Sequence, residues 1–303
     1  MILKHLKSFI CIVLLFTSNL FSIDVSGVYS GAIYNKLTNG IVGTHGAFYR
    51  FTDDYKYTLE ISSTKYFNTF KIPEQYFDSE MIYEEKGIYR VNTNNALDYI
   101  YFSEATPYCA IGKLGVISFS KRLLFLYNGR QLIFDSNFVL KGFDPVMRIT
   151  DIKTSSYLTE GDIKYDGRNF IDRANNLLRP WVEGISGDGV EEWIEITVDN
   201  SNSIYNSYIS SLLLANGYVD FDKPYLYLAN NRIKQLRIQC IDEGLDFIIE
   251  LEDTSQLQEV KLPRNVYGKK PVFRLSILEV YKGEKWDDTC LNFIIPIGEV
   301  TEK

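Results

Sequence analysis

The chain has 303 residues, enough for two domains of ordinary size, and its 46% hydrophobic and 23% charged residues exclude a wholly disordered protein. The formal net charge is −7 and the sequence has no basic block, so we expect no nucleic-acid partner. With two histidines in all, few mechanisms that use imidazole are open to it. The 15% aromatic content, mostly Tyr and Phe, is typical of a β-rich protein.

Residues 1–22 have the pattern of a secretory signal peptide. Lys4 and Lys7 precede an apolar run at residues 9–16, and cleavage is expected after Ser22. The run is shorter than the roughly 20 apolar residues of a spanning helix, although an uncleaved anchor is the alternative. The sequence thus predicts an exported protein, periplasmic or extracellular, with no membrane span after signal removal.

Three cysteines follow the predicted signal peptide, namely Cys109, Cys240 and Cys290. An odd number allows at most one intramolecular disulfide. Cys240 and Cys290 share one half of the chain, so they either pair or remain as buried thiols.

The composition changes near residue 145. All three tryptophans and most of the net negative charge follow this point, whereas Tyr and Phe are concentrated before it. Gly142 and Pro145 are turn formers at the junction. We therefore predict two domains after the signal peptide, at residues 23–145 and 146–303.

The first domain is predicted to be an antiparallel β-barrel or meander. Short aromatic runs alternate with turn signals such as Asn128-Gly129, which favours hairpins. The pattern loosely resembles small lipocalin-like barrels, which are filled by their own side chains or hold one small ligand. His45, between Gly43 and Gly46, is expected in a loop. The predicted strands cover residues 28–34, 47–51, 55–62, 87–91, 99–102, 116–119, 123–127 and 131–134.

The second domain contains four recognisable motifs. They are WVEGISGDGVEEWIEI at 181–196, NGY at 216–218, NNRIKQL at 230–236 and YKGEKWDDTC at 281–290. In this order they resemble the discoidin-like C-type module of the NAD glycohydrolase translocation domain family, over residues 148–297. The resemblance implies a galactose-binding-like jelly roll with recognition loops at one end, and a role in attachment, with glycans as the usual proposed ligand.

Alternating apolar residues support the same fold class independently. Residues 193–198, 236–240, 247–251 and 273–280 each read as a half-buried strand. The chain is therefore predicted to be all-β, with a small barrel followed by a jelly-roll sandwich.

Glu183, Asp188 and Glu191 are expected close together on one glycine-containing loop. Like charges at this spacing need a cation or a basic partner between them, and Ca²⁺ and Arg232 are the two hypotheses. The resemblance also implies a structural Ca²⁺ site in related folds. This chain departs from the usual pattern there, with Arg173 after Asp172 in place of Gly, and Asn292-Phe293 in place of Ser-Glu. No Cys or His spacing supports zinc.

A sugar-binding surface needs planar polar groups and an aromatic face. The alternatives are that Trp181 and Trp193 pack in the core and that Asn216-Gly217 only forms a turn; Trp286 is either a rim contact or a lid on the core. The predicted ligand-binding residues are Trp181, Glu183, Asp188, Asn216, Tyr218, Asn230, Asn231 and Arg232.

No nucleophile elbow, phosphate loop, dinucleotide fingerprint or zinc-protease motif occurs in the sequence. Paired carboxylates for glycoside hydrolysis are the remaining catalytic hypothesis. We therefore predict a protein that is not an enzyme, and whose jelly roll recognises a glycan or a surface protein. The alternatives are an envelope protein with a structural role, and a carrier that holds a small ligand in the barrel.

Overall fold

A computed structural model of the chain describes residues 27–36, 42–51, 53–62, 81–103, 113–119, 123–127, 131–135, 147–171, 179–201 and 206–301. The predicted signal peptide, the junction near residue 145, the Asn128-Gly129 turn, Cys109 and Asp172 lie outside these residues. Within them, no helix is long and apolar enough to cross a membrane.

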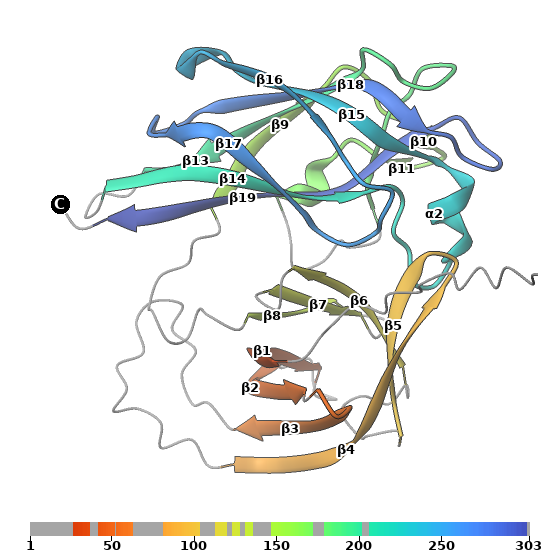
Figure 1. The fold of residues 1–303 in the computed structure, drawn as a ribbon, viewed down its shortest axis with the longest axis vertical. Coiled ribbons are helices and arrows are strands. Elements are labelled where there is room, and N and C mark those ends of the chain that lie inside the picture. The colour runs from red at the N-terminus through yellow and green to blue at the C-terminus, as the bar shows by residue number, and fades with distance from the viewer. Residues whose placement is uncertain are drawn as a thin grey trace, which may run out of the picture.

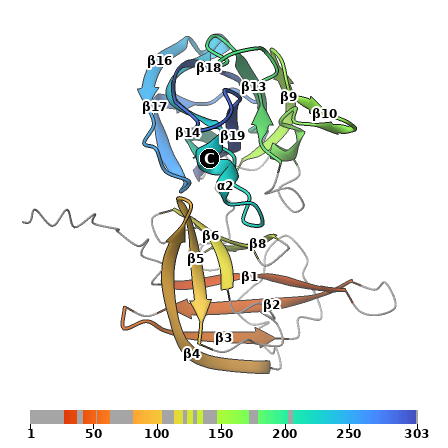
Figure 2. The same ribbon diagram turned by 90° about the vertical axis from the view of Figure 1, so that its right-hand side faces the viewer.

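The first half of the chain forms a closed barrel, which confirms the predicted fold (Figures 1 and 2). Each strand pairs antiparallel with the next, and β8 closes on β1 through Ser30↔Asp135 and Gly31↔Phe134. The strands are β1 (Gly27–Lys36), β2 (Val42–Phe51), β3 (Lys56–Ser62), β4 (Met81–Asn94), β5 (Leu97–Phe102), β6 (Lys113–Phe119), β7 (Leu123–Tyr127) and β8 (Gln131–Asp135).

Two local expectations for the barrel are wrong. His45 lies in β2 opposite Ile33 and not in a loop, because the β1–β2 ladder continues through the glycines on either side of it. The strand expected at residues 87–91 is longer: β4 runs to Asn94, and Asn95 and Ala96 make the turn with φ of 49° and 62°. Positive φ at both central residues is the geometry of a tight hairpin.

The second half forms a two-layer sandwich. Its strands follow the order β17-β14-β19-β15-β18-β13-β9, with β12 paired to β19 and β16 paired to β15. The link between β19 and β15 is parallel and only two residue pairs long, so the order folds there into two layers. The elements are β9 (Arg148–Thr154), β10 (Thr159–Glu160), β11 (Ile163–Lys164), η2 (Arg168–Phe170), β12 (Trp181–Val182), β13 (Trp193–Asp199), β14 (Asn206–Asn216), α2 (Tyr225–Ala229), β15 (Asn231–Cys240), η3 (Ile241–Glu243), β16 (Leu245–Glu250), β17 (Gln258–Val266), β18 (Val272–Tyr281) and β19 (Thr289–Thr301).

The sandwich core is built from the alternation visible in the sequence. Ile194, Ile196 and Val198 of β13 point inward, and the first part of β18 does the same through Phe273, Leu275 and Ile277. Trp193 belongs to the other face of β13, where the guanidinium carbon of Arg274 lies 4.3 Å from its ring centroid. The alternative that Trp193 packs in the core is therefore wrong, whereas Trp181 is fully buried in it.

The barrel covers the outer face of the layer formed by β14 and β19. Residues of these strands that point away from the sandwich core form a second apolar cluster with barrel residues of β5 and β6. In both ribbon views the β4–β5 hairpin reaches toward α2 (Figures 1 and 2). The cluster includes Leu97, Tyr99 and Ile117 from the barrel and Leu213, Ala215, Val219, Phe221, Tyr227, Leu257, Phe293 and Ile295 from the sandwich.

Phe221 of the sandwich packs directly against Gly115 of the barrel. A Cβ placed on Gly115 of β6 would lie 2.2 Å from the Cγ of the Phe221 ring, so the barrel strand needs glycine at this position. The Tyr99 hydroxyl donates to the Phe221 carbonyl at 3.3 Å, and burial raises the pKa of Tyr99 to about 12. Aromatic packing and a buried hydrogen bond therefore hold the same residue.

Gly115→Val is expected to destabilise the protein by about 1–3 kcal/mol, because the new side chain overlaps Phe221. Phe221→Ala is expected to cost about 3 kcal/mol for the lost ring. The double variant should lose less than the sum of the two, since the valine fills vacated space. Urea unfolding of the four proteins measures this. A stabilising Gly115→Val, as β-propensity alone favours, would contradict the contact.

Candidate functional site

Three segments meet at one end of the sandwich: residues 183–192, the start of β15, and residues 282–289. We call this region the loop end. The Asn231 amide N–H donates to the Asp288 carbonyl at 2.9 Å, and the Glu183 N–H donates to the Thr289 carbonyl at 3.2 Å. These bonds bring together the three motifs that the sequence singled out at 181–196, 230–236 and 281–290.

The side chain of Glu183 is buried under the other residues of the loop end and is not displayed on its surface. Its side chain is 0% exposed, and its two carboxylate oxygens accept hydrogen bonds from the backbone N–H groups of Ile185 at 2.9 Å and Thr289 at 3.1 Å. Desolvation raises the pKa of this carboxyl group, and the two N–H donors oppose that shift. Gly189 has a φ of 65°, and a Cβ there would overlap the Glu183 side chain. The expectation that Glu183 is displayed beside Asp188 is therefore wrong.

Asp188 has a basic partner, but it is Lys282 and not Arg232. The Lys282 ammonium group bonds to the Asp188 carboxylate, and the Asn231 amide donates to the same oxygen at 3.2 Å. The bond from Lys282 is the main reason why the pKa of Asp188 is lowered. Among the described residues, no group of three or more His, Cys, Asp or Glu side chains could hold a metal ion.

Arg232 is buried and paired with Asp253. Its Nε and Nη2 atoms donate to the two carboxylate oxygens at 3.0 and 2.7 Å, the bidentate geometry that suits a guanidinium group. The exposed fractions of the two side chains are 7% and 35%. Its Nη1 atom donates to the carbonyls of Asn230 at 2.9 Å and Lys282 at 3.1 Å. Arg232 therefore joins the loop end to residue 253.

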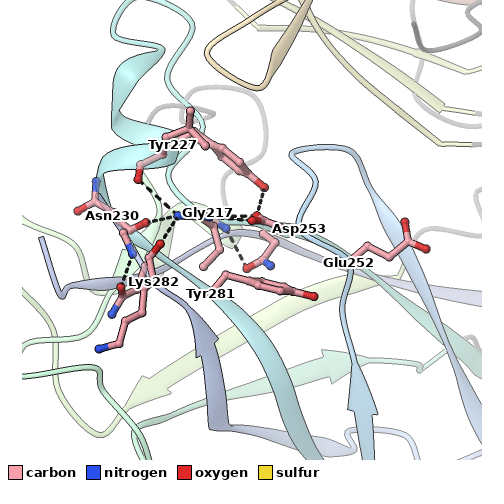
Figure 3. A network of polar contacts seen from close by, with 12 residues as sticks. Gly217, Tyr227, Asn230, Glu252, Asp253, Tyr281 and Lys282 are labelled. Atoms are coloured by element: carbon pink, nitrogen blue, oxygen red, sulfur yellow. Dashed lines mark hydrogen bonds and ion pairs between the residues drawn. The ribbon is translucent and has the colours of Figure 1, made fainter. Parts of the chain in front are cut away.

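Figure 3 shows this network, with Tyr227 and Asp253 on one side and Asn230 and Lys282 on the other. The Tyr227 hydroxyl donates to Asp253 at 3.3 Å, and its ring centroid lies 5.6 Å from the guanidinium carbon of Arg232. Asn230 donates its side-chain amide to the Leu226 carbonyl at 2.9 Å, which caps the end of α2. The side chains of Asn230, Asn231 and Arg232 thus hold neighbouring backbone segments in place through hydrogen bonds.

Asn216 and Trp181 have similar internal roles. The Asn216 amide is fully buried, donates to the Ile233 carbonyl at 2.6 Å, and accepts from the N–H groups of Gly217 and Ile233. Gly217, with a φ of 76°, makes the turn expected after it. The indole N–H of Trp181 donates to the Ser156 carbonyl at 3.0 Å.

Tyr218 is half-buried and belongs to a small polar chain. Its hydroxyl donates to that of Tyr165 at 3.5 Å, and Tyr165 donates to Glu160 at 3.1 Å. Burial raises the pKa of Tyr218, and the bond to Tyr165 adds to the shift. The pKa of Asp288 is also raised, first by desolvation and then by the charge of Glu160. Within the described part of the chain, no donor bonds to the Asp288 carboxylate.

The loop at residues 282–288 carries exposed charged side chains of the loop end, and residues 185–187, 190 and 191 are exposed beside it. Lys282 and Asp287 are 61% and 70% exposed. Trp286 is half-buried, and the Lys285 ammonium nitrogen lies 4.2 Å from its ring centroid. This loop belongs to the motif at 281–290, but its residues are not among the predicted ligand-binding residues. The available signal was the sequence itself, in which Trp286 follows Gly283 and directly precedes Asp287 and Asp288.

The predicted site residues therefore separate by exposure. Asp188 and Tyr218 reach the surface in part, and the other six are buried. Their contact with a ligand stays a prediction; the described hydrogen bonds give the buried six a supporting role. The buried six are Trp181, Glu183, Asn216, Asn230, Asn231 and Arg232.

Cys240 and Cys290 are buried free thiols, so the disulfide alternative is wrong. Burial raises the pKa of Cys240 to about 11 and that of Cys290 as well. Thiols with a raised pKa are poor nucleophiles, which fits packing rather than redox chemistry.

Arg232→Ala is expected to lower the free energy of unfolding by about 3 kcal/mol, because Asp253 and two carbonyls lose their donor in a low-dielectric site. Arg237→Ala is the matched control. Arg237 makes the same bidentate pair with Asp246, but both side chains are 46% exposed, so we expect little change. Equal losses in urea unfolding would contradict the assignment.

Glu183 and Asp188 are expected to change stability in opposite directions with pH. The folded-state pKa of Glu183 is raised, so its contribution is fully present below the unfolded value of 4.5 and is lost as pH rises through the folded value. The pKa of Asp188 is lowered, so its contribution is lost as pH falls. Unfolding free energies of Glu183→Gln and Asp188→Asn, relative to the unmodified chain from pH 3 to 8, should diverge with opposite slopes. Parallel slopes would refute this.

The family model of the NAD glycohydrolase translocation F5/8 type C domain matches residues 145–295. A comparison with curated proteins finds no match. The chain is similar to the solved F5/8 type C domain of a Bacteroides fragilis protein, at 13% identity and a TM-score of 0.35, covering 51% of this chain and 97% of that one.

Two further solved structures are similar to the chain. One is the family 32 carbohydrate-binding module of Streptococcus pneumoniae EndoD, at 8% identity and a TM-score of 0.34, covering 52% of this chain and 99% of the module. The other is the mycobacterial arabinofuranosyltransferase AftD, at 15% identity and a TM-score of 0.33, covering 54% of this chain. This chain spans only 13% of the length of AftD.

The sandwich fold, the four motifs and the match to the family model all fall in the second half of the chain. Residues 145–295 form a domain of the NAD glycohydrolase translocation F5/8 type C family, as the motifs at 181–196 and 281–290 implied.

Proposed function

We propose that this is an exported, non-catalytic binding protein whose sandwich recognises a glycan on a cell surface through the 282–288 loop. The observation that carries the proposal is the anchoring of this loop from below. The Lys282 carbonyl accepts from Arg232, the Gly283 N–H donates to the Asn231 side chain at 2.7 Å, and the Trp286 N–H donates to the Ala229 carbonyl at 2.8 Å. A surface ordered before binding loses less entropy when a ligand docks.

The side chains around this loop have the chemistry that a sugar needs. Trp286 and Tyr218 offer aromatic surface for the C–H face of a ring. Asp288 offers carboxylate oxygens that no described donor occupies, and Asp287 and Lys282 offer exposed charged groups. A few convergent polar groups beside an aromatic surface is the usual composition of a small-ligand site.

Catalysis finds little support in the same geometry. A glycosidase needs two carboxyl groups that reach the substrate. Glu183, the most strongly desolvated acid of the predicted set, is fully buried, with a backbone donor on each oxygen. His45 belongs to a barrel strand and not to the loop end. We infer that the loop end binds its ligand without transforming it.

Export is proposed from residues 1–22, with the periplasm or the cell exterior as the site of action. A glycan is the ligand that the loop chemistry favours. A surface protein as partner, an envelope role or a small ligand in the barrel would each leave the glycan array described below blank.

The full chain is expected to bind a subset of a glycan array, without a requirement for added Ca²⁺. Asp288→Asn and Trp286→Ala should each weaken that binding by about tenfold or more, because one removes a hydrogen-bonding charge and the other a stacking surface. Arg237→Ala, which changes an exposed pair outside the loop end, should bind as the unmodified chain does. A blank array, or variants that bind equally well, would refute the proposal.

A further inference from the structure

The loop at residues 251–257, between β16 and β17, contacts both halves of the protein. We call it the bridging loop. Toward the barrel, the Ser255 hydroxyl donates to the Ala96 carbonyl at 2.9 Å. The Gln256 amide nitrogen donates to the Asp98 carboxylate at 2.8 Å and is 3.3 Å from the Val116 carbonyl. These bonds seat the tip of the β4–β5 hairpin on the sandwich.

Gln256 matters to the barrel because Asp98 is buried. Desolvation raises the pKa of the Asp98 carboxyl group, and the hydrogen bonds from Thr93, at 2.6 Å, and Gln256 lower it. Removal of the Gln256 amide leaves one carboxylate oxygen without this donor. A buried charge that loses a donor costs more than an exposed one.

Toward the loop end, the same short segment holds Arg232 through Asp253. The Tyr281 hydroxyl, next to Lys282, donates to the Leu251 carbonyl at 2.9 Å. Tyr227 touches both sides: it is part of the apolar cluster with the barrel, and its hydroxyl donates to Asp253.

The bridging loop is itself closed by hydrogen bonds. Glu252 exchanges two bonds with the Gln258 side chain, at 2.7 and 2.9 Å, and the Gln256 N–H donates to the Thr254 hydroxyl at 3.2 Å. A loop tied at its base moves as a unit, so a change at residues 255–256 is expected to shift Asp253.

We propose that docking of the barrel on the bridging loop positions Arg232 and so orders the 282–288 loop. The barrel then acts as a positioning element for the ligand surface without touching the ligand. The role of the 282–288 loop in binding rests on the proposed function, but its ordering by the barrel does not. The chemical basis is a path in three parts. Gln256 bonds to Asp98 of the barrel, the short backbone of the bridging loop joins Gln256 to Asp253, and Asp253 holds Arg232, which donates to the Lys282 carbonyl.

The test is amide hydrogen exchange on the full chain without ligand. Gln256→Ala should speed exchange at the Gly283 and Trp286 amides by about tenfold or more, although these amides bond to Asn231 and Ala229 and not to residue 256. Gln239→Ala is the matched control, because the Gln239 amide donates to the exposed Asp246 at 3.1 Å. It should leave the same amides unchanged. Unchanged exchange there in Gln256→Ala, with faster exchange confined to residues 95–98, overturns the proposal.

A second pair of variants tests the path independently, with the unfolding free energy of each variant measured alongside. Ser255→Ala removes a single bond to the hairpin, and Asp253→Asn removes the charge that holds Arg232. In a double-variant cycle, their effects on exchange at Gly283 should be coupled by at least about threefold if the path is continuous. Additive effects overturn the proposal. Because no ligand is present, a blank glycan array together with coupled exchange would refute the proposed function and leave the positioning role intact.

Discussion

The buried pair of Arg232 and Asp253 is the interaction on which the rest of the loop end depends. A guanidinium group at 7% exposure is stable only when its donors are occupied. Here they go to a carboxylate, to the backbone carbonyls of Leu228 in α2 and of Asn230 just before β15, and to a carbonyl of the 282–288 loop. The same charge that needs these partners therefore fixes three segments relative to one another. Replacing Arg232 by an apolar residue would remove the cost of burying a charge, and it would also remove the hydrogen bonds that fix the three segments relative to one another.

A second constraint is the apolar outer face of β14 and β19. In a sandwich that stood alone, Leu213, Ala215, Phe293 and Ile295 would face water. The barrel covers them, with Phe221 seated over Gly115. The two halves are therefore joined by a buried surface as well as by the chain itself. In our proposal, the bridging loop is the segment through which the barrel positions residues of the sandwich.

Much of the fold could be predicted from local patterns. Barrel strands alternate and end at turn residues, so their positions could be read from the sequence, and β13 and β18 alternate in the same way. His45 was misplaced because its flanking glycines look like a loop, although a ladder with β1 holds them in a strand. Trp193 was misplaced because the large ring suggested the core, while the register of β13 turned it outward.

The site was harder to predict, because its side chains are held by hydrogen bonds between residues far apart in the sequence. The polar side chains of Asn230, Asn231 and Arg232 suggested an exposed ligand-binding surface. However, β15 begins at Asn231, and Arg232 is buried. The partner of Arg232 is 21 residues away, and Asp253 belongs to no motif. The residues that do reach the surface, such as Lys282 and Trp286, lay inside a recognised motif, but only the hydrogen bonds beneath them show that the loop is held in place.

The central claim is that ligand binds at the 282–288 loop. The three tryptophans are natural reporters of it, since Trp181 is buried in the core, Trp193 lies under Arg274 and Trp286 lies on the loop. Titration of the ¹⁵N-labelled full chain with a bound glycan, followed by the indole N–H resonances, tests the claim directly. The account predicts a shift of the Trp286 resonance while the Trp181 and Trp193 resonances stay in place. A Trp286 resonance that does not move at saturation would contradict it.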